Sequence, residues 1–190
     1  MSDFSTYEYA VRQRAEGKWI AARVGLITLY VLFALSFLLL GVANGMKWQA
    51  LVWLLPISTW LLFFMTWRYV NVEYEYAIVA GELTLFKIFG NRSRRRVTAL
   101  TLRDAAAIAP YTGAESDEKI NAFAPTRAYF AISSAHAENV YYILAERKTR
   151  TGDKLSRERI VLYFEATDRA VDTCRFYNPS ATVRRTKGKE

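Results

Sequence analysis

The stretch VGLITLYVLFALSFLLLGVANGM, residues 24–46, contains no charged side chain. After Lys47, the stretch WQALVWLLPISTWLLFFMTW, residues 48–67, is uncharged as well. A bilayer core about 30 Å thick is crossed by about 20 helical residues, so each stretch is long enough to span it. Soluble helices carry a polar stripe, and neither stretch has one. The sequence therefore predicts two transmembrane helices, at about 22–43 and 48–68, joined by a short external loop.

Basic residues flank the two uncharged stretches unevenly. The loop between the predicted spans offers only Lys47. On the other side of the spans lie five basic residues: Arg12, Arg14, Lys18, Arg23 and Arg68. Cytoplasmic segments next to a span carry the excess of Lys and Arg. We therefore expect a multi-pass protein of the plasma membrane, with both termini in the cytoplasm.

Aromatic residues stand where the predicted spans end. Indole and phenol rings prefer the level of the lipid headgroups. Four residues are expected to anchor the spans there: Trp19, Trp48, Trp67 and Tyr69.

Two glycines near the end of the first span are candidate helix-packing residues. Gly41 and Gly45 have the small-xxx-small spacing that lets two helices approach each other closely. At mid-depth the spans offer only hydroxyl groups. Conduction and transport usually require ionisable groups at that depth. The hairpin of residues 19–68 is therefore expected to be an anchor.

Residues 1–18 precede the predicted spans and are also patterned. Ser5 and Glu8 have the spacing of a capping box, and Phe4 with Tyr9 fits the hydrophobic staple around it. This pattern predicts a cytoplasmic amphipathic helix from about residue 6 to residue 16, with one mildly apolar face. A frayed tail is the alternative, since terminal segments are often poorly ordered.

The hydrophobic period changes from helical to two-residue at residue 69. In YVNVEYEYAI, residues 69–78, valine, tyrosine and isoleucine alternate with mostly polar residues, which is the pattern of a half-buried strand. Ala80 and Gly81 supply a turn, and ELTLFKIF returns as a second strand. Six clear strands and one short strand, AAAIAPY, are predicted in all. Strands spaced in this way are typical of an antiparallel barrel or sandwich.

The strands are followed by a predicted helix. Thr167 is a good N-cap, Asp168 lies in the first turn, and an Asn-Pro pair ends the helix. About seven strands with a C-terminal capping helix is the layout of a pleckstrin-homology-like domain. The sequence thus predicts an α+β membrane protein. A transmembrane hairpin precedes a cytoplasmic pleckstrin-homology-like barrel or sandwich over residues 69–180, and a basic, mobile tail covers residues 181–190.

The chain resembles an uncharacterised family of small bacterial membrane proteins with two spans. The resemblance lies in the helical hairpin that runs into NVEYEYAIVAGELTLFKI, residues 71–88, in the Arg-rich turn that follows, and in RDAAAIAPY, residues 103–111. It implies a cytoplasmic domain of the bacterial pleckstrin-homology-like type and a membrane location. It implies no catalytic residue. The acidic segment of residues 112–125 matches no part of this pattern.

The turn GNRSRRR, residues 90–96, is the strongest charge feature of the predicted domain. If the strand of residues 69–79 leaves the membrane steeply, the next strand brings this turn back toward the bilayer. A basic side chain beside an anionic leaflet gains about 1 kcal/mol. Four arginines are therefore expected to contact lipid headgroups: Arg92, Arg94, Arg95 and Arg96. A solvated hairpin turn is the alternative.

The composition argues against several kinds of chemistry. Cys174 and His136 are the only Cys and His, which are too few for a disulfide framework or a Cys/His metal site. Glu73 and Glu75 share one strand face about 7 Å apart, and a solvated strand face explains them more simply than acid–base chemistry. No phosphate-binding loop or dinucleotide fingerprint occurs. We therefore expect no catalytic residue, no metal, no cofactor and no enzyme.

The net charge of +8 comes from 26 basic and 18 acidic residues. Positive charge next to the membrane explains this excess more simply than nucleic-acid binding, because no groove-reading helix is evident. The sequence favours a non-enzymatic binding module that presents its cytoplasmic domain to a protein partner or to anionic lipid headgroups. The alternative is a structural or accessory subunit of a larger membrane complex, held through its transmembrane hairpin. A second copy of the chain is a further candidate partner.

Overall fold

The computed structural model describes residues 6–12, 14, 16–90, 93–134, 136–151 and 154–185. The chain divides into two compact units. The first, called the hairpin unit, comprises residues 14–72 and 88–93. The second, called the sandwich unit, comprises residues 1–13, 73–87 and 94–190.

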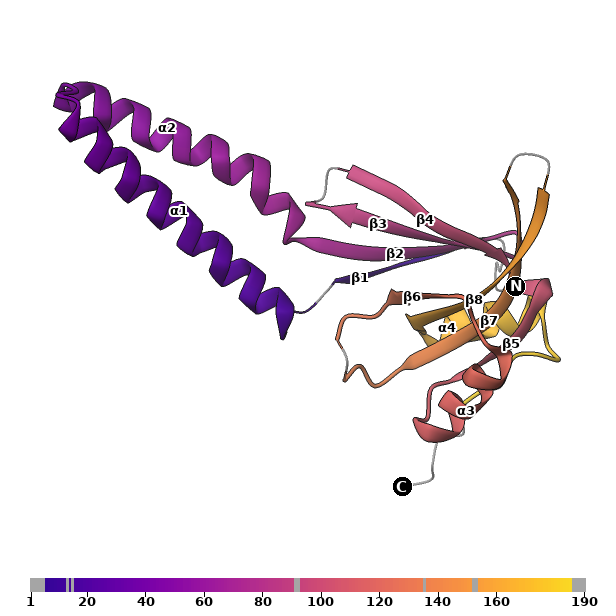
Figure 1. Ribbon diagram of the computed structural model, residues 1–190. Coiled ribbons are helices and arrows are strands. Elements are labelled where there is room, and N and C mark those ends of the chain that lie inside the picture. The colour runs from indigo at the N-terminus through magenta and orange to yellow at the C-terminus, as the bar shows by residue number, and fades with distance from the viewer. Residues whose placement is uncertain are drawn as a thin grey trace. The chain divides into compact units, whose positions relative to one another are not determined.

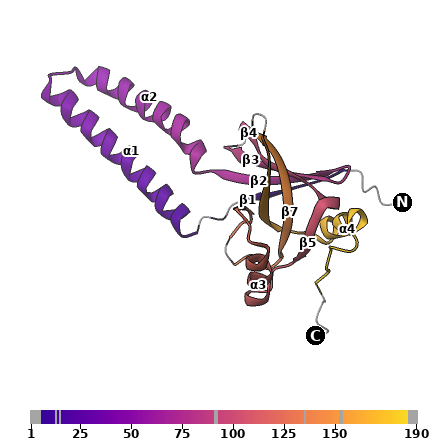
Figure 2. The same cartoon turned by 45° about the vertical axis from the view of Figure 1, so that its right-hand side comes forward.

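The hairpin unit is built on two long helices that lie side by side (Figures 1 and 2). They are α1, Lys18–Ala43, and α2, Trp48–Thr66, followed by the short 3-10 helix η1, Trp67–Tyr69. The hydroxyl groups of Tyr30 and Thr66 lie 2.6 Å apart and join the two helices. The Tyr30 ring also meets the Phe63 ring edge-on.

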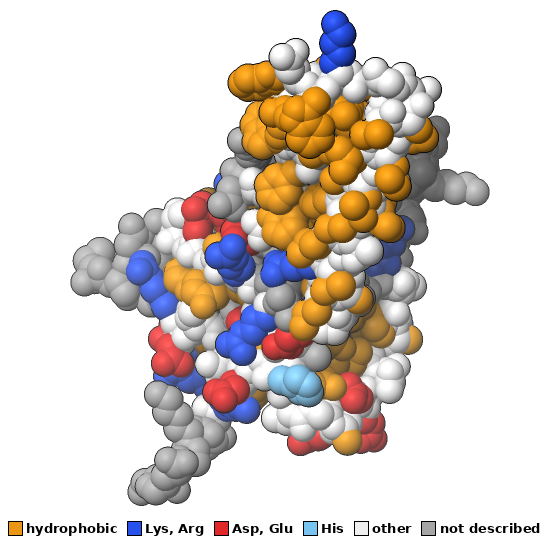
Figure 3. Space-filling view, turned by 90° about the vertical axis from the view of Figure 1, so that its left-hand side faces the viewer, with side chains coloured by type: hydrophobic (Ala, Val, Ile, Leu, Met, Phe, Trp, Pro, Cys, Tyr) orange, Lys and Arg blue, Asp and Glu red, His pale blue; other side chains and the backbone are white. Residues whose placement is uncertain are grey.

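Both helices expose apolar side chains over most of their surface. By length and composition, Trp19–Ala43 and Trp48–Tyr69 are apolar enough to cross a membrane. Only 6% of the most apolar window of each helix is buried, whereas the core helix of a soluble protein is mostly buried. Figure 3 shows apolar side chains gathered over the face of the helices that is turned toward the viewer. The two helices therefore suggest association with a membrane.

Sheet A belongs largely to the sandwich unit and has the strand order β1-β2-β3-β4. The strands are β1, Thr6–Arg12; β2, Val72–Val79; β3, Glu82–Phe89; and β4, Ser93–Thr101. β1 runs antiparallel to β2, with Thr6 opposite Val79 and Arg12 opposite Glu73.

The predicted N-terminal helix is wrong, because residues 6–12 form strand β1. Tyr7, Tyr9 and Val11 alternate along this segment, and Val11 is buried. Tyr7 and Tyr9 both place their rings within 6.2 Å of the Tyr76 ring in β2. A spacing of four residues fits both a helix and a strand, and the available partner strand decides between them. Ser5, on which the capping box rested, lies outside the described residues.

The helical hairpin is therefore an insertion within a β-hairpin. β1 and β2 are paired neighbours in sheet A, and α1, α2 and η1 lie between them along the chain. Residues 13–17 connect β1 to α1, and residues 70–71 connect η1 to β2. Two short connections thus join the helices to adjacent strands of one sheet (Figure 1).

Sheet B has the strand order β5-β7-β8-β6. The strands are β5, Ala105–Pro110; β6, Arg127–Ala131; β7, Val140–Thr151; and β8, Lys154–Glu165. The 3-10 helix η2, Leu102–Asp104, leads from β4 into β5. β6 pairs with β8 in parallel, so the expectation of an all-antiparallel domain is wrong at this edge. The connection from β6 to β8 passes through β7, and this allows β6 and β8 to run in the same direction.

The core lies between the inner faces of the two sheets. Its most buried members include Tyr76 in β2, Leu83 in β3, Ile143 in β7 and Phe164 in β8, all completely buried. Helix α4, Asp168–Tyr177, adds Ala170, Val171 and Cys174 to the same cluster. Thr167 caps this helix as predicted, accepting a hydrogen bond from the Ala170 N–H at 3.2 Å.

The predicted α+β architecture is confirmed. Two apolar helices near the N-terminus, two packed sheets and a C-terminal helix are present, as in a pleckstrin-homology-like sandwich. The described residues form eight strands rather than about seven, because β1 was predicted to be a helix. In the described part of the chain the two sheets do not close into a barrel.

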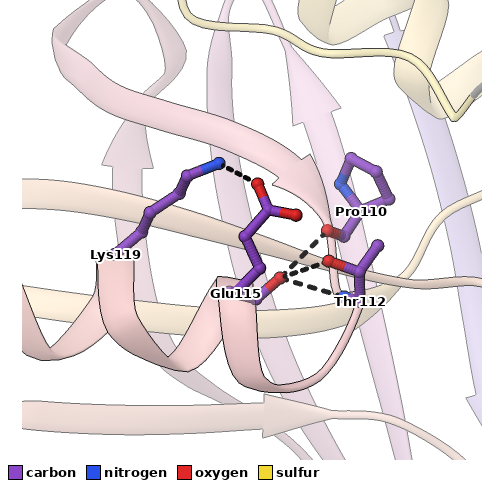
Figure 4. Close-up of polar contacts among 5 residues, drawn as sticks. Pro110, Thr112, Glu115 and Lys119 are labelled. Carbon is purple, nitrogen blue, oxygen red and sulfur yellow. Dashed lines mark hydrogen bonds and ion pairs between the residues drawn. The ribbon is translucent and has the colours of Figure 1, made fainter.

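The acidic segment of residues 112–125 contains helix α3, Ala114–Phe123. Ile120 and Phe123 of this helix pack with Tyr142, Leu144 and Val161 on the outer face of sheet B. Figure 4 shows how α3 begins. Ser116 Oγ accepts a hydrogen bond from the Thr112 N–H at 2.9 Å and lies 3.1 Å from Thr112 Oγ1. The segment therefore packs on the outer face of sheet B and covers part of it.

The predicted mobile tail begins later than expected. The Ile108 N–H donates to the Ala181 carbonyl, and the Val183 N–H donates to the Ile108 carbonyl, each at 2.8 Å. The chain after α4 thus pairs with the free edge of β5, and the expectation of a mobile tail is wrong for residues 181–185. Residues 186–190 lie outside the described residues.

Candidate functional site

Phe89 at the end of β3 and Gly90 after it pack against the end of α2. The Gly90 N–H donates to the Asn71 carbonyl at 2.9 Å, and the Tyr69 and Phe89 rings meet edge-on at 6.4 Å. A Cβ added to Gly90 would lie 2.8 Å from Arg68 Cβ, and the φ of Gly90 is +56°. Only glycine fits this position without strain. Gly90 and the end of α2 therefore form one local structure.

An open cavity of about 200 Å³ lies at this contact. It is lined by Phe63, Phe64, Trp67, Arg68, Asn71 and Gly90. Trp67 stacks on Phe63 with ring centroids 5.1 Å apart. We call this cavity the α2-end cavity. It combines an aromatic wall with one cationic side chain.

The orientation of Arg68 is fixed by its neighbour Tyr69. An Nη2–H of Arg68 donates to the Tyr69 hydroxyl at 2.8 Å, and the guanidinium carbon lies 4.9 Å from the centroid of the Tyr69 ring. Neither contact neutralises the guanidinium charge. Arg68 makes no ion pair with any carboxylate of the described residues.

The arginines of the predicted basic turn are not equivalent. Arg92 lies outside the described residues. Arg94 stacks over the Phe86 ring at 3.8 Å and pairs with Glu75 at 2.7 Å. Arg96 pairs with Glu82 at 3.6 Å. Arg95 is exposed and has no hydrogen bond or ion pair to any residue that the structure describes. Two of these charges are therefore partly neutralised within sheet A.

The two carboxylates considered for acid–base chemistry are held in ion pairs. Glu73 pairs with Arg12 of β1 at 3.4 Å, and Glu75 pairs with Arg94 of β4 at 2.7 Å. Both glutamates are largely covered, with side-chain exposures of 20% and 14%. The two side chains thus tie β2 to other strands of sheet A, which is a structural role.

The predicted interface anchors lie at the ends of the two helices. Trp19 is in the first turn of α1, and Trp48 is the first residue of α2 with its side chain exposed. Trp67 and Tyr69 are in η1, beside the α2-end cavity. Each position is compatible with a location at the headgroup level.

Gly41 and Gly45 do not share one helix face. A Cβ added to Gly41 would lie 2.5 Å from Leu51 Cδ2, so this glycine admits a side chain of α2. Gly45 lies beyond the end of α1, at a φ of +69°. The structure therefore assigns Gly41 to packing within the hairpin and Gly45 to its turn.

A second cavity of about 470 Å³ lies beside the start of α4. Arg184 and Arg185 line it, and both are engaged with the protein: Arg184 pairs with Asp172, and the Arg185 N–H donates to the Tyr141 hydroxyl at 3.0 Å. Sequence reasoning missed these residues because it placed them in a tail.

The surroundings of Cys174 and His136 fit structural roles for both side chains. Burial raises the pKa of the Cys174 thiol to about 12, so the thiol is a poor nucleophile near neutral pH. His136 follows a bend and donates its N–H to Ser134 Oγ at 3.1 Å. Within the described residues, no group of three or more His, Cys, Asp or Glu side chains could hold a metal ion.

The chain belongs to the bacterial PH-like domain family (DUF6106), whose family model matches residues 5–184. The match includes β1, the helical hairpin and the sandwich, so the inserted hairpin is part of the family's pattern. No curated protein and no solved structure matches the chain.

Proposed function

We propose that this family member is a membrane-anchored, non-enzymatic binding module. Its helical hairpin spans the plasma membrane, both termini are cytoplasmic, and the PH-like sandwich binds anionic lipid headgroups at the inner surface. One observation carries the proposal: the apolar hairpin is inserted between two paired strands of sheet A, and Gly90, which follows β3, packs on the end of α2.

The insertion ties the sandwich to the hairpin at two points of the chain. A domain behind a single linker can drift away from the bilayer, whereas this sheet is joined to the hairpin by two short connections from adjacent strands. The second connection, residues 70–71, is held by the hydrogen bond between Asn71 and Gly90. Two connections of the chain, rather than one, therefore lead from the hairpin into sheet A.

The charge distribution supports an anionic surface as the ligand. Arg95 is exposed on β4 without a partner among the described residues, and Arg68 has no carboxylate partner there either. Each basic side chain at an anionic leaflet gains about 1 kcal/mol. The positive charges of Arg95 and Arg68 therefore suit an anionic lipid surface.

The accessory-subunit role receives less support. It relied on Gly41 and Gly45 as an open contact face for another membrane protein. Leu51 of the same hairpin occupies the space at Gly41, and Gly45 lies in the turn. The exposed rings of Trp53 and Trp60 need an apolar environment, and lipid tails supply it.

The orientation is tested by thiol labelling in intact cells. The buried Cys174 gives a low background, so one new cysteine can be followed at a time. A membrane-impermeant maleimide should label Met46→Cys in intact cells, and Glu118→Cys only after the cells are opened. Labelling of Glu118→Cys in intact cells, or protection of Met46→Cys, would contradict the proposed topology.

The lipid contact is tested with the full chain in nanodiscs. Because β1 precedes the hairpin, a fragment starting at residue 69 lacks a strand of sheet A and is not a suitable sample. Amide exchange of β4 should slow in discs that contain phosphatidylglycerol relative to discs of phosphatidylcholine alone, and salt should reduce the difference. Arg95→Gln should diminish the effect, while Arg175→Gln, at an exposed position on α4, should not. Equal exchange in both kinds of disc would refute headgroup contact.

A further inference from the structure

We propose that the α2-end cavity binds the phosphate of one anionic glycerophospholipid, with Arg68 as the phosphate ligand. The inference rests on the proposed function, because a spanning hairpin places the end of α2 at the headgroup level. It goes further than a general attraction to charged lipid, since it assigns a single lipid to a defined position on the chain.

The charge of the hairpin unit calls for an external anion. Within residues 14–72 and 88–93, Glu16 is the only acidic residue. The basic residues are six: Arg14, Lys18, Arg23, Lys47, Arg68 and Arg92. In the sandwich unit, by contrast, arginines such as Arg94 find carboxylates within the fold. Six basic residues of the hairpin unit thus share one carboxylate, which leaves positive charge for an external anion.

A second arginine at the same end of the helices, Arg23, has an N–H donor without a partner among the described residues. It lies two turns before Tyr30 in α1, and Tyr30 contacts Thr66 near the end of α2. The Nε of Arg23 is shielded from solvent and has no hydrogen-bond partner among the described residues. A buried N–H donor without a partner is costly, and an external anion nearby would lower that cost.

The geometry around Arg68 suits a phosphate. A guanidinium presents a planar fork of N–H donors that matches phosphate oxygens. Tyr69 holds this fork from one side, through a 2.8 Å hydrogen bond and a ring contact at 4.9 Å. The remaining donors have no carboxylate partner among the described residues. Gly90 leaves room beside the Arg68 backbone because it has no side chain.

The lining of the cavity favours a lipid over a soluble phosphate. Phe63, Phe64 and Trp67 form its aromatic wall, and Trp60 stacks on Phe64 at 5.5 Å, so the wall continues along α2. A volume of about 200 Å³ accommodates a phosphate with its glycerol, but not two acyl chains. The chains would lie outside the cavity on the apolar surface of α2.

The test is native mass spectrometry of the full chain in detergent, titrated with phosphatidylglycerol. One lipid per chain should be retained, and phosphatidylcholine should be retained less. Arg68→Gln should weaken retention about tenfold, as expected for loss of a charged hydrogen-bonding group. Lipid retention by Arg68→Lys should lie between that of the unchanged chain and that of Arg68→Gln, because lysine keeps the positive charge but lacks the planar set of N–H donors. Lys47→Gln, the same charge change at the other end of the hairpin, should have no effect.

The outcomes separate this inference from the proposed function. Unchanged retention in Arg68→Gln, or equal retention of both lipids, would overturn it. So would displacement of the lipid by millimolar inorganic phosphate, which would identify a soluble anion as the ligand. An equal loss in Arg68→Gln and Arg95→Gln would refute a defined site and leave surface attraction standing. Retention that depends on Arg68 alone, with no lipid effect on β4 exchange, would support the site and refute the surface contact. The near-ultraviolet circular dichroism of each variant, from tryptophan in the hairpin and from tyrosine in the sandwich, verifies its fold.

Discussion

The helical hairpin and the sandwich use apolar side chains in opposite ways. In the hairpin, the side chains of Leu39 and Trp53 are 69% and 71% exposed. In the sandwich, Ile143 and Leu162 are completely buried between the sheets. Strands bury alternate residues, whereas these helices are apolar on all sides. The mean hydropathy of zero therefore averages an apolar hairpin and a more polar sandwich. An apolar side chain is exposed in the first region and buried in the second.

Charged groups differ between the two regions in the same way. The sandwich satisfies many of its charges internally, as in the network in which Glu158 pairs with both Arg127 and Arg147 at 2.7 Å. The hairpin unit leaves Arg68 without a carboxylate partner among the described residues. The sandwich is thus the self-contained region, and the hairpin depends on what surrounds it.

The largest expected effect comes from truncating an apolar residue in each region. Ile143→Ala should lower the free energy of unfolding of the sandwich by about 3 kcal/mol, because it leaves a cavity in the core. Leu39→Ala, on the exposed surface of α1, should leave that transition unchanged. Denaturant unfolding of the full chain in detergent, followed by tyrosine circular dichroism, measures both.

The two regions can be observed separately in this experiment. All five tryptophans lie between Trp19 and Trp67, in the hairpin unit. Of the twelve tyrosines, only Tyr30 and Tyr69 lie in that unit. A shift of the tyrosine transition in Leu39→Ala equal to that in Ile143→Ala would contradict the separation of the two environments.

The next effect concerns a buried amide in the sandwich. The side-chain NH₂ of Asn178 donates to the carbonyls of Leu102 at 2.9 Å and Ala105 at 3.0 Å, joining η2 and β5 to the end of α4. Asn178→Ala should cost about 2 kcal/mol, because buried carbonyls lose their donor. The same unfolding experiment measures this loss. Ser180→Ala removes only an exposed hydroxyl that donates to Asn178 Oδ1 and should cost much less; equal losses would refute the role assigned to Asn178.

A smaller effect distinguishes two ion pairs of sheet A. Glu75 is mostly covered and lies 2.7 Å from Arg94, whereas Glu82 and Arg96 are more than half exposed and 3.6 Å apart. Glu75→Gln should therefore cost up to about 1 kcal/mol and Glu82→Gln close to none. Unfolding at low and high salt measures both changes. If Glu82→Gln lowered the free energy of unfolding more than Glu75→Gln, burial would not determine which ion pair contributes more to stability.

Much of the fold could be predicted because its signals are local. Charge-free stretches predicted the helices, and two-residue alternation predicted most strands. Residues 6–12 were misassigned because the four-residue spacing of Tyr7 and Val11 fits both periods, and β2, about 60 residues later, decides between them. Residues 181–185 were misassigned because their order depends on the distant edge of β5.

The candidate site was less predictable than the fold. Arg68 was recognised only as an indicator of orientation, and Gly90 only as part of a turn. Their contact joins residues more than twenty positions apart, and no sequence spacing indicates it. The four-arginine turn was visible as charge, but the ion pairs of Arg94 and Arg96 depend on the neighbouring strands. Charge content can be read from a sequence, whereas the pairing of charges requires the fold.

The smallest expected effect is the response of α3 to acid. The hydrogen bond and charge of Lys119 lower the pKa of Glu115 below its ordinary value of 4.5. A lowered pKa in the folded state means that the carboxylate stabilises the helix above the unfolded pKa, and that this contribution is lost as the pH falls through the folded pKa. Both side chains are mostly exposed, so the effect is small.

Amide exchange of α3, corrected for intrinsic rates, should therefore accelerate slightly below pH 4.5. Glu115→Gln and Lys119→Gln should each remove that acceleration, because either change abolishes the pair. If both variants kept the full acid response, the Glu115–Lys119 pair could not be its source.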